Sequence, residues 1–433
     1  MAGRKKQPEL TVEEKLQQAL VPEAEQPYKV PDNWCWVRLG NIISVSSGKA
    51  LTIKSMKLDG KIPVYGGNGI TGYHNESYID GENIVIGRVG AYCGSVHYIF
   101  GKAWVTDNAL IVDFKREEIN LRYLYWLLIN TNLRTNDSSS AQPVISGSKI
   151  YDLPVPFIPL AEQQRIVERI ETLFAKLDEA KEKLQNTLDT FETRKSAILH
   201  KAFTGELTAN WRKQHGLTLD SWKEKTLKSL SDKIGDGLHG TPNYTDNGDY
   251  AFINGNNFAG DKIEIKPETK KVDFNEYMKY KVELNDKTVF VSINGTLGKT
   301  AFYNNENIIL GKSACYINVN QNLNKYYLRH FFCSKDFVNY ANEKATGSTI
   351  KNLGLKAMRN LKINLPTLDE QTEIVRIIDN LLAKEQQAHS IAQNALAQID
   401  LIKKSILARA FRGQLATNNP ADEPAIKLLK KVL

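Results

Sequence analysis

The feature that most constrains the fold is a long stretch of sequence that occurs twice. Residues 162–207 and 370–415 align at a constant offset of 208 positions without a gap, and 19 of the 46 aligned pairs are identical. Both copies begin with Glu-Gln and end with Ala-Phe-x-Gly-x-Leu. A repeat of this length indicates the duplication of a structural unit, so the chain divides into two similar halves.

Each copy has the features of one long helix. A proline precedes it (Pro159, Pro366), and an acidic residue stands in its first turn (Glu162, Glu370), where the positive helix end favours a carboxylate. A glycine suited to a C-cap follows the last turn. At ~1.5 Å per residue, about 43 residues make a helix of roughly 65 Å.

Apolar residues recur every seven positions in both copies, which is coiled-coil patterning. We therefore predict that the two helices pair, in antiparallel orientation. The alternative, two amphipathic helices that each lie on their own domain, stays open. The predicted interface residues are Ile170, Leu177, Leu184, Phe191, Ile198, Phe203, Ile378, Leu381, Ile399, Ile402, Ile406 and Phe411.

The segments outside the two copies differ from each other but contain matching anchors. DNWCWVRLGNI parallels DSWKEKTLKSL, IVIGRVGAYCGSVHY parallels VFVSINGTLGKTAFY, and LRYLYWLL parallels KYYLRHFF. Short strand-like runs separated by Gly, Asn and Asp turns fill the rest. The predicted fold class is α+β, with two mixed β-rich domains alternating with two long helices that form an antiparallel coiled coil, in a pseudo-two-fold arrangement.

The predicted domain boundaries follow this order. An N-terminal arm includes a short helix with a capping box formed by Thr11 and Glu14. The divisions are 1–30 for the arm, 31–155 for the first β-rich domain, 156–216 for the central long helix, 217–363 for the second β-rich domain, 364–415 for the distal long helix and 416–433 for the C-terminal tail.

Composition limits the class of protein. The formal net charge is +8, and Lys and Arg exceed Asp and Glu by 12 to 10 over residues 30–150 and by 21 to 16 over residues 217–365. This excess suggests an anionic partner. The chain has no apolar run long enough for a membrane span, and its N-terminus does not resemble a secretory signal. The four cysteines form no CxxC pair, so we expect a cytoplasmic protein without a zinc site or disulfides.

The sequence contains no complete catalytic or metal-binding motif. GTLGKT and LGKS lack the first glycine of a phosphate-binding loop, and GRVGAYCG does not match a dinucleotide-binding fingerprint. The histidines have no ligand spacing. Asp249 with Glu264 and Lys266 is similar to a metal-nuclease core, but short strings of this type are common. We therefore predict no catalytic residues and no metal site.

The duplicated layout resembles a specificity subunit of a Type I restriction–modification system. The two Glu-Gln helix starts, at Glu162 and Glu370, and the two Ala-Phe-x-Gly-x-Leu ends carry the resemblance, together with IGDGLHGTPNY, VYGGNGITGY and GRVGAYCG. The resemblance covers about residues 31–415. It implies that the β-rich domains are target-recognition domains, each reading one half of a bipartite, asymmetric DNA target, and that the helices set the spacing.

The resemblance also implies partners and cofactors. Two modification subunits, which use S-adenosylmethionine to methylate adenine, and two restriction subunits, which use ATP and Mg²⁺, would assemble with a chain that binds no cofactor and is not itself an enzyme. Two other classes of protein stay open. One is a coiled-coil adaptor with protein- or carbohydrate-binding modules, and the other is a nuclease acting through Asp249 and Glu264.

Residues that could contact DNA are polar or basic and lie in turns or at strand ends. The first set is Lys49, Lys54, Tyr65, Asn68, His74 and Arg88, and the second is His239, Thr241, Asn243, Asn254, Asn256, Asn257, Ser292 and Lys299. The alternative for each is a solvated turn residue. We expect the tryptophans Trp34, Trp104, Trp126 and Trp222 to pack in cores.

Overall fold

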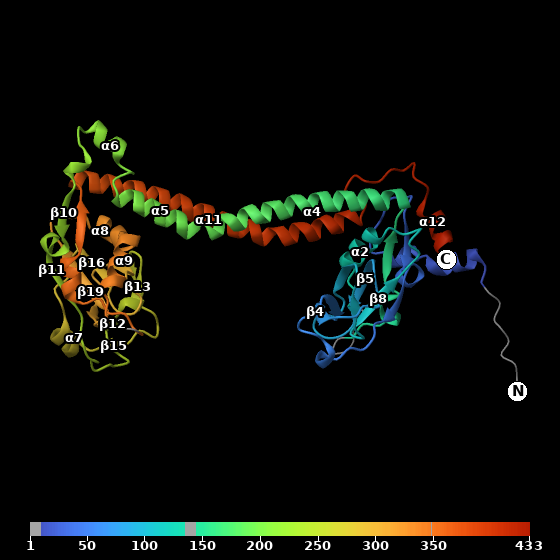
Figure 1. Ribbon diagram of the computed structural model, residues 1–433, viewed down its shortest axis with the longest axis horizontal. Coiled ribbons are helices and arrows are strands. Elements are labelled where there is room, and N and C mark those ends of the chain that lie inside the picture. Colours follow the sequence, from blue (N-terminus) through green and yellow to red (C-terminus); the bar gives the residue numbers. More distant parts are fainter. Residues whose placement is uncertain (1–9, 135–143, 348) are drawn as a thin grey trace. The chain divides into compact units, whose positions relative to one another are not determined.

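The computed structural model describes residues 10–134, 144–347 and 349–433. The described residues form two compact units (Figure 1). Of the described residues, unit 1 comprises 10–134, 144–183 and 395–433, and unit 2 comprises 184–347 and 349–394. The boundary cuts both long helices, so each unit holds one β-rich domain together with a length of each helix.

Unit 1 is built on a four-stranded antiparallel sheet in the order β2-β8-β5-β6. A three-stranded sheet (β4-β3-β7) and a two-stranded ribbon (β1-β9) accompany it. The strands are β1 Cys35–Arg38, β2 Ser44–Ser47, β3 Ile62–Gly66, β4 Gly69–His74, β5 Glu82–Gly87, β6 Val96–Phe100, β7 Trp104–Val105, β8 Ala109–Asp113 and β9 Pro154–Phe157. The helices are α1 Val12–Ala19, α2 Leu121–Asn130, α3 Gly147–Ile150, most of α4 Leu160–Asp189, the end of α11 Leu368–Ala410, and α12 Ala425–Val432, with 3-10 turns η1 Glu23–Glu25, η2 Leu39–Asn41 and η3 Ile53–Ser55.

Unit 2 has a matching four-stranded sheet in the order β11-β19-β16-β17, with smaller sheets β15-β12-β18, β13-β14 and β10-β20. The strands are β10 Lys223–Thr226, β11 Ser231–Asp236, β12 Tyr250–Ile253, β13 Phe258–Ala259, β14 Lys262–Ile263, β15 Lys271–Val272, β16 Thr288–Ser292, β17 Thr300–Phe302, β18 Ile308–Leu310, β19 Ala314–Val319 and β20 Lys362–Leu365. The helices are α5 Phe191–Phe203, α6 Ala209–Gln214, α7 Phe274–Tyr280, α8 Lys325–Phe332, α9 Lys335–Lys344, α10 Leu355–Asn360 and the start of α11, with 3-10 turns η4 Leu219–Ser221, η5 Leu227–Leu230 and η6 Gly255–Asn257.

The two units share one scaffold, as the repeat predicts. In each main sheet, the strand that comes last along the chain (β8 or β19) lies between the first strand (β2 or β11) and the second (β5 or β16). In each unit a parallel pair, β3 with β7 or β12 with β18, joins the smaller sheet to the segment that leads into that central strand. An antiparallel ribbon, β1-β9 or β10-β20, leads to the first turn of a long helix. The predicted fold class is confirmed by this arrangement.

The core of each unit joins its sheet to its long helices. In unit 1, Ile84 of the sheet, Tyr123 of α2 and Ile166 of α4 belong to one buried cluster, to which α1 and α12 also contribute. In unit 2, the corresponding cluster includes Val289 and Tyr327 together with residues of α5 and α11. Full burial of each aliphatic side chain contributes about 1.5–3 kcal/mol. The domain and its helix segments are therefore one folding unit.

The long helices run antiparallel within unit 1. Arg165, early in α4, forms an ion pair with Asp422, which follows α11. Thirteen residues further along α4, Asp178 accepts a hydrogen bond from Lys403 Nζ at 2.5 Å. The partner position moves backwards along the chain as the position in α4 moves forwards, which is antiparallel pairing.

The helices also run antiparallel within unit 2. The ring of Phe191 lies 4.5 Å from the ring of His389, centroid to centroid. Arg194 Nε donates to Glu385 Oε2 at 2.7 Å. Further on, Leu199 packs in the cluster that contains Ile374 of the first turns of α11. The alternative of two unpaired amphipathic helices is thereby excluded within each unit.

Eleven of the twelve predicted interface residues are buried or half-buried, and Ile402 is not. Ile402 is 43% exposed, although Ile374, four heptads earlier in its column, is fully buried. A straight α-helix drifts ~20° per heptad from a seven-residue repeat, so a column that starts at the centre of the interface turns towards solvent. The buried residues are Ile170, Phe203, Ile378, Ile399 and Phe411, and the half-buried ones are Leu177, Leu184, Phe191, Ile198, Leu381 and Ile406.

The first long helix also differs from the prediction of one continuous helix, because it divides into α4 and α5 at Thr190. The backbone hydrogen bonds continue across the division, from Thr190 N to Asn186 O and from Arg194 N to Thr190 O. The Thr190 hydroxyl also donates to Asn186 O. A threonine that bonds back to the preceding turn bends a helix without ending it.

A duplicated set of hydrogen bonds fastens each domain to its helix. Trp34 Nε1 donates to Glu162 Oε2 at 2.7 Å, and Trp222 Nε1 donates to Glu370 Oε2 at 3.0 Å. Both carboxylates are fully buried. Of the tryptophans, Trp34 lies in a core as predicted, whereas Trp104, Trp126 and Trp222 are only half-buried. We call each Trp–Glu pair with its surroundings the joint of its unit.

The glutamine that follows each joint glutamate is duplicated in the same way. Gln163 Oε1 accepts from Asn120 N, and Gln371 Oε1 accepts from Asn324 N, both at 2.8 Å. These asparagines are the N-caps of α2 and α8. Their side-chain oxygens accept hydrogen bonds from free backbone N–H groups in the first turn of each helix. The Glu-Gln pair that starts each repeat therefore orients the domain on the helix.

A buried histidine of unit 2, which contacts α11, supports a pH prediction. His330 Nε2 contacts Asp379 Oδ1 at 2.9 Å, with Arg329 beside it and Asp261 paired to Arg329. Burial and Arg329 lower the pKa of His330 to about 4, against the opposing effect of Asp379. The unfolded chain protonates this histidine near pH 6.5, whereas the native chain protonates it only near pH 4. The free energy of unfolding is therefore highest above pH 6.5 and falls as the pH drops from 6.5 towards 4.

We therefore expect the free energy of unfolding of unit 2 to fall by about 2 kcal/mol more between pH 7 and pH 5 in the wild-type chain than in the variant His330→Gln. The glutamine keeps a donor for Asp379 but does not titrate. Urea unfolding at the two pH values measures the difference. Identical pH dependence in both proteins would show that His330 does not control it.

Candidate nucleic-acid interface

The loops of unit 1 gather at one end of its sheets. The end of β2 lies beside the start of β8 (Ser47 with Leu110), and the end of β5 lies there too (Gly87 with Ala109). Beyond β5, Val89 pairs with Val144. Residues 47–49, 66–69, 87–94, 106–108 and 144–149 therefore lie together, and we call them the loop end of unit 1.

The loops of unit 2 meet at the equivalent end. Asp236 at the end of β11 pairs with Cys315, and Ser292 at the end of β16 pairs with Ala314. Leu353 N donates to Ile293 O, as Ile145 N donates to Arg88 O in unit 1. We call residues 236–240, 253–257, 292–299, 310–313 and 351–354 the loop end of unit 2.

Close approaches of backbone to backbone hold both loop ends in shape. A Cβ added to Gly48 would lie 2.3 Å from the carbonyl oxygens of Val105 and Thr106. A Cβ added to Gly237 would lie 2.1 Å from the carbonyl carbon and oxygen of Leu310. Only glycine permits this approach, so the two glycines fix the loops against the strands beside them.

Three of the six predicted residues of the first set lie at the loop end of unit 1. Asn68 is exposed. Arg88 Nη1 donates to Ser47 Oγ at 3.3 Å and to Asp107 O at 3.4 Å. Lys49 Nζ lies 4.4 Å from the centre of the Tyr78 ring. A half-exposed arginine held by loop oxygens is suited to presenting its remaining N–H groups to an acceptor.

The other three residues of that set lie elsewhere. Lys54 is exposed on η3, and Tyr65 is half-buried within β3. His74 pairs with Ile62 at the opposite end of the β3-β4 hairpin and packs edge-on against Trp104 at 5.5 Å. Its ring is thus part of the packing of the smaller sheet, a role that alternation along the hairpin could have indicated.

In unit 2, His239, Lys299 and Asn256 lie exposed at the loop end, and Thr241 lies just beyond it. His239 Nε2 contacts Asp236 Oδ2 at 2.7 Å. A hollow of about 390 Å³ opens beside this pair. The residues that line it are Asp236, His239, Ile293, Asn294, Lys312, Asn352, Gly354 and Leu355.

Four predicted residues of unit 2 use their side chains inside the protein. Ser292 is 1% exposed, and its hydroxyl donates to Thr296 O. Asn254 and Asn257 form reciprocal capping bonds around η6. Asn243 Nδ2 donates to Glu276 Oε1 at 2.6 Å. Turn formation therefore accounts for Asn254 and Asn257, a contact with α7 occupies Asn243, and the buried Ser292 has no surface for a base.

Lys312, Asn294 and Asn352 also line the hollow of unit 2, and none of them was predicted from the sequence. Lys312 stands in LGKS, which does not match a phosphate-binding loop, and it lies two residues before the central strand β19. Its equivalent in unit 1 is Asp107, which precedes β8. A basic residue in the loop before a central strand could have indicated Lys312 as a candidate DNA-binding residue.

The described residues contain no group of His, Cys, Asp and Glu side chains able to hold a metal ion. Asp249 precedes β12, whereas Glu264 follows β14 and pairs with Lys266 at 3.8 Å. The four cysteines are free thiols. In the part of the chain that the structure describes, no helix combines the length and apolar character needed to cross a membrane.

Fold and site together define a duplicated protein with two β-rich domains, each of which is fastened to paired helices. Each domain gathers loops at one end of its sheets, and the loops of the two domains differ in sequence. Two segments, residues 31–190 and 220–395, match the family model of the Type I restriction modification DNA specificity domain. The chain therefore belongs to the family of Type I restriction–modification specificity subunits.

Related proteins and structures agree with this membership. The chain is 24% identical to the EcoBI specificity subunit of Escherichia coli, over 91% of this chain and 89% of the relative. It is 27% identical to the EcoKI specificity subunit of Escherichia coli K12, over 77% of this chain and 70% of the relative. The crystal structure of the HsdS subunit from Thermoanaerobacter tengcongensis has the same fold, with a TM-score of 0.64 at 18% identity, over 90% of this chain and 100% of that one.

Proposed function

We propose that this chain reads a bipartite, asymmetric double-stranded DNA target, one half with each loop end. The observation that supports the proposal is that equivalent loop positions carry unlike chemistry. Arg88 in unit 1 occupies the place of Ile293 in unit 2, and Asp107 occupies the place of Lys312. A carboxylate accepts from cytosine, and a basic side chain donates to guanine, so the two loop ends would read different letters.

We further propose that the chain is a non-catalytic subunit that assembles with two modification subunits and with restriction subunits. Membership in the specificity family supports this assembly. The chemistry of methylation and cleavage, with S-adenosylmethionine, ATP and Mg²⁺, would reside in the partners. The paired helices, with α11 spanning 43 residues, would set the spacing between the half-targets. The comparisons do not favour an adaptor with protein- or carbohydrate-binding modules.

Exchange of one loop end tests the proposal. In a chimaera that carries residues 44–150 of another specificity subunit, we expect one half of the target to change while the other half and the gap stay the same. The exchanged segment leaves the β1-β9 ribbon and the Trp34–Glu162 hydrogen bond intact. Footprinting of the complex with modification subunits reads both halves, and a footprint altered in both halves, or none in the wild-type complex, would contradict the proposal.

A further inference from the structure

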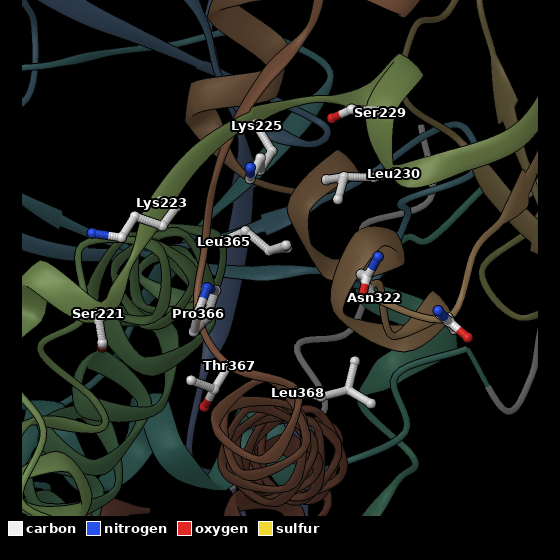
Figure 2. Close-up of a pocket in the computed structure, with 11 residues that line it drawn as sticks. Ser221, Lys223, Lys225, Ser229, Leu230, Asn322, Leu365, Pro366, Thr367 and Leu368 are labelled. Atoms are coloured by element: carbon white, nitrogen blue, oxygen red, sulfur yellow. The ribbon is translucent and has the colours of Figure 1, made fainter.

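Unit 2 has an open groove beside its joint, between the β10-β20 ribbon and the first turn of α11 (Figure 2). Its volume is about 510 Å³. Lys223 and Lys225 of β10 stand along one side, as Figure 2 shows, and Leu365 and Leu230 contribute apolar surface. Leu368, at the start of α11, is 47% exposed at its rim. The groove thus combines an apolar floor with positive charge.

The equivalent place in unit 1 is filled by the chain itself. The amphipathic helix α12, labelled in Figure 1, belongs to unit 1. It buries Ala425, Leu428, Leu429 and Val432 in the core of that unit. These positions, i, i+3, i+4 and i+7, are the spacing by which a helix lies in a groove. Ala425 N donates to the carbonyl oxygen of Asn33, two residues before β1.

The N-terminal arm closes the same place in unit 1 from the strand side. Leu20 pairs with Val37 of β1, and Val21 N donates to Trp36 O at 3.0 Å. Helix α1 places Leu16 in the same core as α12, and Glu13 of α1 accepts from Lys430 of α12. The scaffold shared by the two units therefore has a helix-binding groove, which is covered in unit 1.

The residues that line the groove differ between the units. The register of the ribbons places Lys223 opposite Leu365 where Cys35 lies opposite Phe157, and Lys225 opposite Ile363 where Val37 lies opposite Val155. Two apolar residues of unit 1, Cys35 and Val37, thus correspond to two lysines in unit 2. Within the described residues Lys225 forms no ion pair, and Lys223 Nζ donates only to the backbone oxygen of Asp220.

We propose that the groove of unit 2 binds an acidic amphipathic helix of a partner protein, a modification subunit of the same system. The partner assignment rests on the proposed function. Apolar side chains on one face of that helix would cover Leu230, Leu365 and Leu368, and acidic side chains would meet Lys223 and Lys225. A second copy of α12 is a poorer match, because its polar face carries Lys427, Lys430 and Lys431.

Charge reversal tests the groove. In the full chain, Lys223→Glu with Lys225→Glu should weaken the binding of one of two purified modification subunits about tenfold, since each exposed ion pair contributes up to about 1 kcal/mol. The matched control, Lys287→Glu with Lys335→Glu, makes the same charge change at exposed lysines of unit 2 outside the groove. Native mass spectrometry and titration measure occupancy, and equal affinity in the two variants would overturn the proposal.

A photo-crosslinking residue in place of Lys225 identifies the occupant in the assembled complex with DNA. A crosslink to an acidic amphipathic helix of the modification subunit would support the proposal. A crosslink to α12 of a second copy, a crosslink to DNA, or no crosslink in a complex that has assembled would each overturn it.

The wild-type complex separates the two levels of inference. If wild-type chain binds modification subunits and protects a split target, but the charge-reversed chain behaves in the same way, the groove proposal alone fails. If wild-type chain gives no split footprint, the proposed function fails, whatever the groove binds.

Discussion

The variant Glu370→Ala is expected to destabilise unit 2 by about 3–5 kcal/mol, because it leaves a buried cation without its counter-charge. Arg212 Nη1 donates to Glu370 Oε1 at 2.6 Å, with the two side chains 8% and 0% exposed. The same carboxylate accepts from Thr208 Oγ1 and Trp222 Nε1. Urea unfolding followed by tryptophan fluorescence measures the loss.

The repeat supplies the matched comparison, Glu162→Ala. Glu162 accepts from Trp34, Thr417 and Asn418, all neutral donors. Removing this carboxylate leaves neutral donors without a partner, which lowers the free energy of unfolding by about 1–3 kcal/mol, but it leaves no buried charge unpaired. We therefore expect the smaller loss in unit 1, and a loss as large as that of Glu370→Ala would contradict the importance of the buried cation.

A double variant separates the two costs in unit 2. Arg212→Met with Glu370→Leu removes both charges and fills a similar volume, so most of the stability lost in Glu370→Ala should return. If the double variant were as unstable as the single one, packing rather than the unpaired charge would be the cause.

The joints show what the sequence could and could not predict. The repeat predicted both helices, the order of the domains and the antiparallel pairing, since a duplicated apolar period has few physical interpretations. Glu162 and Glu370 were explained by the helix dipole, because a first-turn carboxylate satisfies that rule on its own. Their hydrogen bonds to Trp34 and Trp222 join positions 128 and 148 residues apart, and no local pattern records such contacts.

The termini were underestimated for a similar reason. The arm and the tail lie outside the repeat, yet Leu16 of α1 and Leu429 of α12 lie in the core of unit 1. An eight-residue amphipathic helix is too short to be stable alone, so its place depends on the groove that receives it. Only the structure of unit 1 shows that this groove exists.

The candidate site was predictable by region but not by residue. Loops rich in glycine and asparagine marked the strand ends that form both loop ends. Asparagine, however, serves turns as readily as base contacts, and Asn254 and Asn257 cap η6. Lys312 was missed because its string was judged against one motif only. Which side chains remain free is decided by the folded loop.

The variant Gly237→Ala is expected to abolish recognition of one half-target. Leu238 N donates to Leu310 O at 2.7 Å, and the added Cβ would lie 2.1 Å from the carbonyl carbon and oxygen of Leu310. Backbone atoms of a buried strand cannot move aside cheaply, so the loop must leave the strand, at about 1–3 kcal/mol. Asp236 and His239, on either side of the glycine, would move with it.

Gly240→Ala is the matched control in the same loop. Its added Cβ would meet only Leu238 Cδ1, at 3.9 Å, which is an ordinary contact. We expect Gly237→Ala to weaken specific binding about ten- to hundredfold, with loss of protection over one half-target, while Gly240→Ala stays near the wild-type value. Gly48→Ala, at the equivalent place in unit 1, should remove protection over the other half-target. Equal binding by Gly237→Ala and Gly240→Ala, with both proteins folded, would mean that the loop end of unit 2 does not contact DNA.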